Sequence, residues 1–267
     1  MRSYTMNIVV APDSYKGSLT SIQAATIIQE AILEVDSSSN VVIKPIADGG
    51  EGTLDCLLST TKSEKVSITC TGPLGGKITT FYGITSSRIA IIECANIVGL
   101  MQVPREKRNP DTTTTFGIGE VIIDALDRGC QSFIIGIGGS ATNDGGLGMM
   151  IALGMTATDK NGKELKGYGK DLLHLDKVDF SNFDPRIAKA TFKVACDVEN
   201  PLCGEKGATS VYGPQKGATP EQIVLYDKAL EKYSDIMEDQ LHIACKHTRG
   251  AGAAGGLALL FYQLGQT

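Results

Sequence analysis

The sequence lacks the features that mark several classes of protein. Its seven cysteines include no CxxC pair and stand at no metal-ligand spacing from the three histidines. This pattern argues against a disulfide framework or a zinc site and predicts reduced thiols in a cytoplasmic protein. No window is apolar over the length of a membrane span, and the first apolar run is too short for a signal peptide. We therefore expect neither a membrane partner nor a secretory leader.

The sequence also contains fewer basic than acidic residues. The 25 lysines and arginines are outnumbered by 30 acidic residues, which gives a net charge of −5 and a pI near 5.3. No basic cluster reverses this balance locally, so we expect no nucleic-acid partner.

The N-terminal part alternates strand-like and helix-like segments. A β-branched run over 7–11 is followed by a polar loop and by a helix that begins at Thr20, which forms a capping-box pattern with Gln23. A second strand-like run over 41–46, another loop and a short helix over 54–59 repeat the order. Strand, loop and helix in this order predict a parallel α/β sheet.

The middle of the chain has a different pattern. Strand-like runs over 65–72, 76–84 and 88–95 have no helix between them, which predicts antiparallel or mixed pairing and a domain boundary near Gly72 to Gly76. Further segments follow in order: a helix over 115–129, strands over 132–137 and 191–197, and a long helix starting at Thr219.

Five polar loops occupy positions where expected strands end or helices begin. They read PDSYKGS, ADGGEG, GGSATNDGG, CDVENP and GPQKGAT, and four of them carry an acidic residue. Ligands of parallel α/β sheets lie beyond the carboxyl ends of the strands. Glycine-rich turns, lysines and carboxylates together suit phosphoryl transfer, in which backbone N–H groups bind phosphate and carboxylates hold Mg²⁺ or accept a proton. No histidine lies in such a loop, which argues against a Ser-His-Asp hydrolase.

The stretch GIGGSATNDGG, residues 136–146, allows a second interpretation. It has no Gly-Lys-Ser/Thr of a Walker A loop, but Gly136, Gly138 and Ala141 fit the dinucleotide pattern, with Asp159 about 20 residues further on. Asp159 lies in an expected hairpin turn, and Asp144 would place a carboxylate beside a pyrophosphate. We therefore disfavour a nicotinamide-dependent oxidoreductase, and keep it and a non-catalytic binding protein as alternatives.

Seven segments resemble the bacterial glycerate kinase family of the glycerate 2-kinase type. In the family's order they read NIVVAPDSYKGSLTS, PIADGGEGTLD, TGPLGGKI, RNPDTTTTFGIGEVI, IIGIGGSATNDGGLGMM, ACDVENPLCGEKGATSVYGPQKGATPEQI and GAGAAGGLA. The resemblance implies transfer of the γ-phosphoryl group of ATP to the 2-hydroxyl of D-glycerate, giving 2-phosphoglycerate, with Mg²⁺. A homodimer is a further expectation.

The resemblance also implies an architecture of two α/β domains, one flavodoxin-like and one restriction-endonuclease-like, that are discontinuous in sequence. We expect residues 1–74 plus 250–267 in the first domain and residues 75–249 in the second. Family members continue past GAGAAGGLA with a further strand and a loop of the type TGEGRID, which this chain lacks. We therefore expect the first domain to be C-terminally incomplete and the kinase activity to be reduced.

The residue types in these loops suggest roles in such a site. Asp48 and Glu51, within one helical turn, are candidates for a Mg²⁺ or general-base site, and Asp197 is the rival base. Asp144 is a second candidate Mg²⁺ ligand, and Arg105 and Arg108 are candidate carboxylate anchors. The remaining candidates for substrate, phosphoryl or phosphate binding are Asp13, Ser14, Lys16, Gly138, Gly139, Ser140, Asn143, Gln215 and Lys216.

Overall fold

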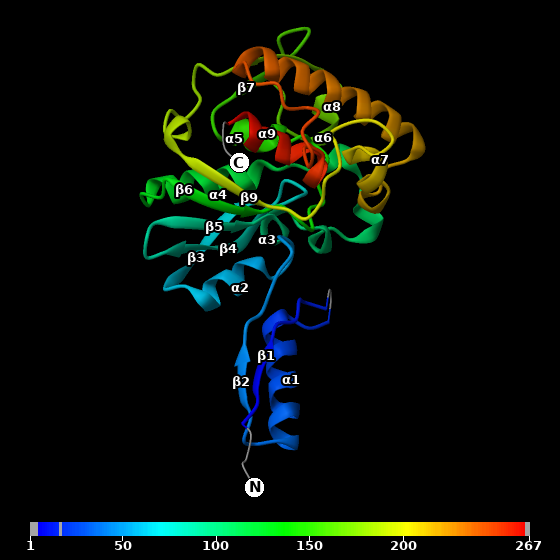
Figure 1. Cartoon of the computed structure of the whole chain (residues 1–267). Coiled ribbons are helices and arrows are strands. Elements are labelled where there is room, and N and C mark those ends of the chain that lie inside the picture. The colour runs from blue at the N-terminus through cyan, green and yellow to red at the C-terminus, as the bar shows by residue number, and fades with distance from the viewer. Residues whose placement is uncertain (1–4, 16–17, 265–267) are drawn as a thin grey trace.

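A small N-terminal unit projects from the rest of the chain in the computed structural model, which describes residues 5–15 and 18–264 (Figure 1). In this βαβ unit, β1 (Asn7–Val10) and β2 (Asn40–Ile43) pair in parallel and α1 (Ser21–Val35) connects them. The predicted capping box is confirmed, because Thr20 Oγ1 accepts from the Gln23 amide and Gln23 Oε1 accepts from the Thr20 amide. The candidate residue Lys16 lies outside the described residues.

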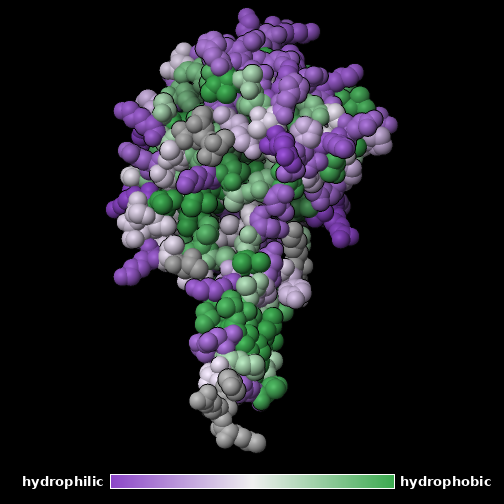
Figure 2. Space-filling view, viewed as in Figure 1, coloured by the Kyte–Doolittle hydropathy of each residue, from purple (hydrophilic) through white to green (hydrophobic). Residues whose placement is uncertain are grey.

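The βαβ unit leaves large apolar side chains in contact with solvent. Val9 is 66% exposed and Val35, at the end of α1, is 90% exposed. Figure 2 shows the resulting apolar surface on the projecting unit. A parallel sheet is normally covered on both faces, so this unit gains little of the burial that stabilises the larger part of the chain.

A five-stranded mixed sheet forms the centre of the larger part. Its order is β3-β4-β5-β6-β9, antiparallel from β3 to β5 and parallel from β5 to β9. The strands are β3 (Ser63–Thr71), β4 (Lys77–Thr85), β5 (Ile89–Glu93), β6 (Ser132–Gly136) and β9 (Thr191–Ala195). The predicted mixed pairing is therefore confirmed, and the carboxyl ends of β5, β6 and β9 lie at one edge.

Helices pack around this sheet and bury one continuous core. They are α2 (Thr53–Thr60), α3 (Cys94–Val98), α4 (Phe116–Asp127), α5 (Leu147–Ala152), α6 (Gly169–Leu172), α7 (Ala208–Tyr212), α8 (Pro220–Leu241) and α9 (Leu257–Gln263). A two-stranded antiparallel sheet adds β7 (Thr156–Asp159) and β8 (Leu175–Asp179). At α8 the predicted start is confirmed, with Thr219 as N-cap and Pro220 in the first turn.

The C-terminal segment packs on the central sheet. Helix α9 contacts β9 and α8, and the Phe261 ring lies 5.5 Å from the Phe192 ring of the central sheet. Residues 257–261 of α9 are 0 to 2% exposed, because all five are apolar and the large core can bury them. Helix α2 also packs on the central sheet, where it contacts β3, β4 and β5. The division into two discontinuous domains stays a prediction.

Over residues 5–15 and 18–264, no helix combines the length and the apolar character that a membrane crossing requires.

Candidate functional site

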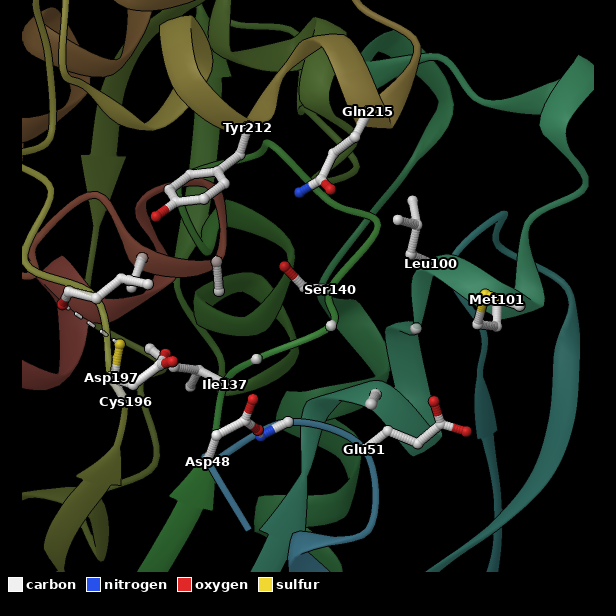
Figure 3. A pocket seen from close by; sticks show the side chains of 18 of the residues that line it. Asp48, Glu51, Leu100, Met101, Ile137, Ser140, Cys196, Asp197, Tyr212 and Gln215 are labelled. Carbon is white, nitrogen blue, oxygen red and sulfur yellow. Dashed lines mark hydrogen bonds between the residues drawn. The ribbon is translucent and has the colours of Figure 1, made fainter. Parts of the chain in front are cut away.

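A pocket of about 490 Å³ lies at the edge where β5, β6 and β9 end. Its walls come from the loop before α2, the segment from α3 to Met101, the loop after β6, the loop after β9 and the turns around 212–216 and 253–254. In Figure 3, Asp48 and Glu51 lie below Ser140, Tyr212 and Gln215 lie above it, and Leu100 and Met101 lie opposite Cys196 and Asp197. The predicted location at the strand ends is therefore confirmed for these loops.

The loop that carries Asp48 touches the central sheet backbone to backbone. A Cβ atom on Gly49 would lie 2.4 Å from the Ala195 carbonyl oxygen, and one on Gly138 would lie 2.7 Å from the Gly50 Cα. The Gly138 amide donates to the Gly49 carbonyl at 3.0 Å. We call this contact between Gly49–Gly50 and the ends of β6 and β9 the glycine joint. It fixes Asp48 beside the loop after β6.

Glu93 also orders the loop that carries Asp48. The sequence analysis did not identify this role. This side chain is 1% exposed, and its carboxylate accepts from the Gly52 amide at 3.2 Å and the Leu54 amide at 2.8 Å. The Glu93 carboxylate therefore caps the N-terminus of α2, although Glu93 lies 39 positions after Leu54 in the sequence. Burial raises the pKa of Glu93, and the two amide hydrogen bonds oppose that rise. The only sequence signal is an acid at the end of a buried strand.

The loop after β6 lines the pocket with Gly138, Gly139 and Ser140. Among the described residues, no hydrogen bond engages the amides of Gly139 and Ser140, whereas the Gly139 carbonyl accepts from the Leu100 amide at 2.8 Å. Gly139 has a φ of +70°, which lies in the left-handed region that glycine adopts more easily than other residues. Two consecutive amides of this kind suit an anion.

Lys216 adds positive charge at the same place. Its ammonium group donates to the Thr142 carbonyl at 2.6 Å and to Ser140 Oγ at 3.3 Å, although the residue is only 2% exposed. An ammonium group has three N–H donors, so one has no partner among the described residues. Burial lowers the pKa of Lys216 to about 8, partly offset by the charge of Asp144. We call Gly139, Ser140 and Lys216 together the anion cradle.

Asp144 lies in the core instead of the pocket, so its position does not fit the expected Mg²⁺ ligand. It is 0% exposed, and its carboxylate accepts from the Thr115 amide and hydroxyl, both at 2.7 Å. It also accepts from the amides of Gly146 and Gly148. The carboxylate therefore joins the starts of α4 and α5. Burial raises the pKa of Asp144 while these hydrogen bonds act to lower it.

Several other candidates also lie outside the pocket wall. Asn143 is fully buried and its amide donates to Thr209 Oγ1 at 3.0 Å. Arg108 donates to the carbonyls of Val103 and Leu100, so it braces the turn behind the pocket. Asp13 and Ser14 belong to the loop after β1, where the Ser14 amide donates to Asp13 Oδ1. Of the predicted residues, the pocket brings together Asp48, Glu51, Gly138, Gly139, Ser140, Asp197, Gln215 and Lys216.

The pocket also contains residues that the sequence analysis did not single out. Cys196 lies next to the exposed Asp197 of the predicted set, and Tyr212 donates from its hydroxyl to Asn200 Oδ1 at 2.6 Å. Burial raises the pKa of both the Cys196 thiol and the Tyr212 hydroxyl. At the opposite end stand Asn96, Leu100 and Met101, none of which belongs to a glycine-rich or acidic motif. Asp197 and Asp48 thus lie at one end of the pocket, the acidic end, and Leu100 and Met101 lie at the other, where Figure 3 also shows Glu51.

The carboxylates of the pocket suit a metal ion that is shared with a ligand. Within the described residues, no cluster of three or more His, Cys, Asp or Glu side chains could hold a metal. Mg²⁺ is commonly held by one or two carboxylates together with phosphate oxygens and water. Asp48 and Glu51 supply that number of carboxylates beside the anion cradle.

Comparison with known proteins gives a consistent result. Residues 8–266 match the profile described as the glycerate kinase family. The chain is 47% identical over 253 residues to a glycerate kinase from Haemophilus influenzae, covering 94% of this chain and 67% of the relative. It is 46% identical to glycerate 2-kinase of Escherichia coli K12, covering 94% of this chain and 66% of that protein. A crystal structure assigned to glycerate kinase 2 of Salmonella typhimurium LT2 superposes with a TM-score of 0.87 at 45% identity, over 99% of this chain and 71% of that one. The chain thus spans about two thirds of the length of these curated relatives.

Proposed function

Because the chain belongs to the glycerate kinase family, we propose that it transfers the γ-phosphoryl group of ATP to the 2-hydroxyl of D-glycerate. The observation that carries this proposal is the anion cradle, in which a buried lysine and two amides that have no hydrogen bond to any described residue lie between carboxylates of two different loops. Phosphoryl transfer needs positioning and charge stabilisation rather than a covalent nucleophile. The cradle supplies both.

Asp197 is the general base in this proposal. It is exposed at the acidic end of the pocket, where the small hydroxy acid would bind, and it accepts the proton of the 2-hydroxyl. The hydroxyl oxygen then forms a bond to the γ-phosphorus as the bond between that phosphorus and the β–γ bridging oxygen breaks, which releases ADP. Lys216 and the cradle amides neutralise the charge on the transferring oxygens.

Asp48 and Glu51 would hold Mg²⁺ in this site. When bound, Mg²⁺ would neutralise the β- and γ-phosphate oxygens. The chain's own contribution is to orient the two carboxylates through the glycine joint and the Glu93 cap.

The reaction is proposed to take place in the cytoplasm. All seven cysteines lie within the described residues and are free thiols, which suits a reducing compartment. A homodimer stays a proposal, supported by the exposed apolar residues of the βαβ unit, and light scattering of the purified chain tests it.

The function is tested by ADP release coupled to NADH oxidation, with D-glycerate as acceptor and L-glycerate as the stereochemical control. We expect turnover with D-glycerate and a ³¹P resonance split into a doublet, because one proton is attached to C2. A triplet would indicate transfer to the 3-hydroxyl. Asp197→Asn should lower kcat at least a hundredfold, in the range typical of a lost general base, while Asp176→Asn, an exposed aspartate on β8, should not. ADP release that is independent of D-glycerate would contradict the proposal.

A further inference from the structure

Leu100 and Met101 form an exposed apolar wall at one end of the pocket, which we call the apolar lip. Met101 is 74% exposed and Leu100 is half-buried, and both line the pocket. Figure 3 places them on the side away from Asp197 and Cys196. Exposed large apolar residues that line a pocket mark a surface for an apolar part of a ligand. Phosphate and glycerate have no such part, whereas the flat faces of a purine base do.

The apolar lip is held rigidly next to the anion cradle. The Leu100 amide donates to the Gly139 carbonyl at 2.8 Å, so the lip and the cradle are joined by one hydrogen bond. Arg108 donates from Nη2 to the Leu100 carbonyl at 3.3 Å and from Nε to the Val103 carbonyl at 3.2 Å. Gln102 Nε2 donates to the Asn96 carbonyl at 2.7 Å and ties the same turn to α3. A ligand whose phosphates occupy the cradle would therefore meet a preformed apolar surface.

Asn96 is a polar residue of the pocket lining next to the lip. It lines the pocket, and its side-chain carboxamide makes no hydrogen bond to any residue that the structure describes, although its main-chain carbonyl accepts from Thr80 and Gln102. A carboxamide offers one donor and one acceptor side by side, which matches the edge of adenine. The acidic end of the pocket lacks this match, since a carboxylate only accepts.

We propose that the apolar lip and the Asn96 carboxamide form the subsite for the adenine base of the nucleotide. The proposal rests on the proposed kinase function and adds the end of the pocket at which ATP binds. The base lies against Leu100 and Met101, the phosphates extend along the anion cradle, and the acceptor lies at the Asp197 end. Arg108 is a positioning residue for the lip, rather than an anchor for the substrate carboxylate.

Methionine methyl NMR tests the placement of the base directly. The chain is labelled with ¹³C at the methionine methyl groups, and the Met101 resonance is identified by its loss in Met101→Leu. Because an aromatic ring shifts nearby nuclei, ADP should move the Met101 resonance, while inorganic tripolyphosphate, which has no base, should leave it in place. ADP that binds by calorimetry without moving this resonance would overturn the subsite and leave the kinase function standing. Absence of any ADP binding would overturn both.

Two substitutions test the contacts separately. Met101→Ala should weaken ADP about tenfold through lost apolar contact and leave tripolyphosphate unchanged, whereas Leu225→Ala, 52% exposed on α8 and away from the pocket, should affect neither. Asn96→Asp should shift the ratio of ADP to GDP affinity at least tenfold towards GDP, because a carboxylate accepts from the N1–H and N2–H groups of guanine. Both nucleotides carry the same phosphates, so the ratio isolates the base. A ratio that does not change would overturn the role of Asn96, and equal ADP affinity in Met101→Ala would overturn the role of the lip.

Discussion

Lys216 should take up a proton when a phosphate group enters the pocket. Burial lowers its pKa from 10.5 to about 8, and among the described residues its ammonium group donates to the Thr142 carbonyl and the Ser140 hydroxyl. A bound phosphate places negative charge beside the third donor and favours the ammonium form. The pKa therefore rises on binding, and the sign of the effect is proton uptake.

The size of the uptake follows from the pKa. With a pKa of about 8, roughly half of the Lys216 side chains are neutral at pH 8 and roughly a tenth at pH 7. If the bound phosphate raises the pKa well above 8, binding should take up about half a proton at pH 8, whereas at pH 7 the uptake by Lys216 falls to about a tenth of a proton and is offset by the proton that ADP itself releases. The phosphates of ADP have a second pKa near 6, so they contribute little at pH 8.

Calorimetry in buffers of different ionisation enthalpy measures this uptake. ADP is titrated in HEPES, tricine and Tris at pH 8 and pH 7, and the slope of binding enthalpy against buffer ionisation enthalpy gives the number of protons. In Lys216→Arg the slope should vanish at pH 8, since arginine keeps its proton at either pH. ADP binding with a slope of zero in the wild-type chain at pH 8 would refute the reasoning, whether or not the arginine variant folds.

Three further predictions concern the loop, the joint and the βαβ unit. Glu93→Ala should lower the free energy of unfolding by about 2–3 kcal/mol, because the buried Leu54 amide and the partly buried Gly52 amide lose their acceptor; an unchanged urea midpoint would contradict the capping role. Gly138→Ala should abolish turnover, because its Cβ would lie 2.7 Å from Gly50 Cα, while Gly76→Ala, which meets nothing within 4 Å, should keep it; equal activity of the two variants would argue against a tight joint. Hydrogen exchange should be faster in β1 and α1 than in β5 and β6, given the poor burial of the βαβ unit; equal protection would show that the unit is stabilised in another way.

Local patterns in the sequence were sufficient for much of the fold. The capping boxes at Thr20 and Thr219 involve residues three positions apart, so both helix starts could be predicted and both are confirmed. The mixed sheet followed from strand-like runs with no helix between them. The packing of α9 could not be predicted in this way, because its apolar sequence shows that it is buried but not which sheet buries it.

The sequence predicted those site residues whose position depends only on the loop that carries them. Asp48, Glu51, Asp197 and Lys216 line the pocket because they follow strand ends or a glycine turn. Asp144 has the same local sequence character, and only contact with Thr115, 29 residues away, shows that its carboxylate is occupied. The sequence did not predict the roles of three residues. Glu93 contacts amides about 40 positions earlier in the chain, and Asn96 and Met101 were identified only because the structure places them in the pocket lining.

The glycine joint also determines how the site responds to changes elsewhere in the core. Gly49, Gly50 and Gly138 have no side-chain rotamers, so assembling this contact costs no side-chain entropy. For the same reason the joint has no side chain that could repack to absorb a shift of β6 or β9. A core substitution that displaces either strand will therefore move Asp48 by a similar distance, and activity should respond to such substitutions before stability does.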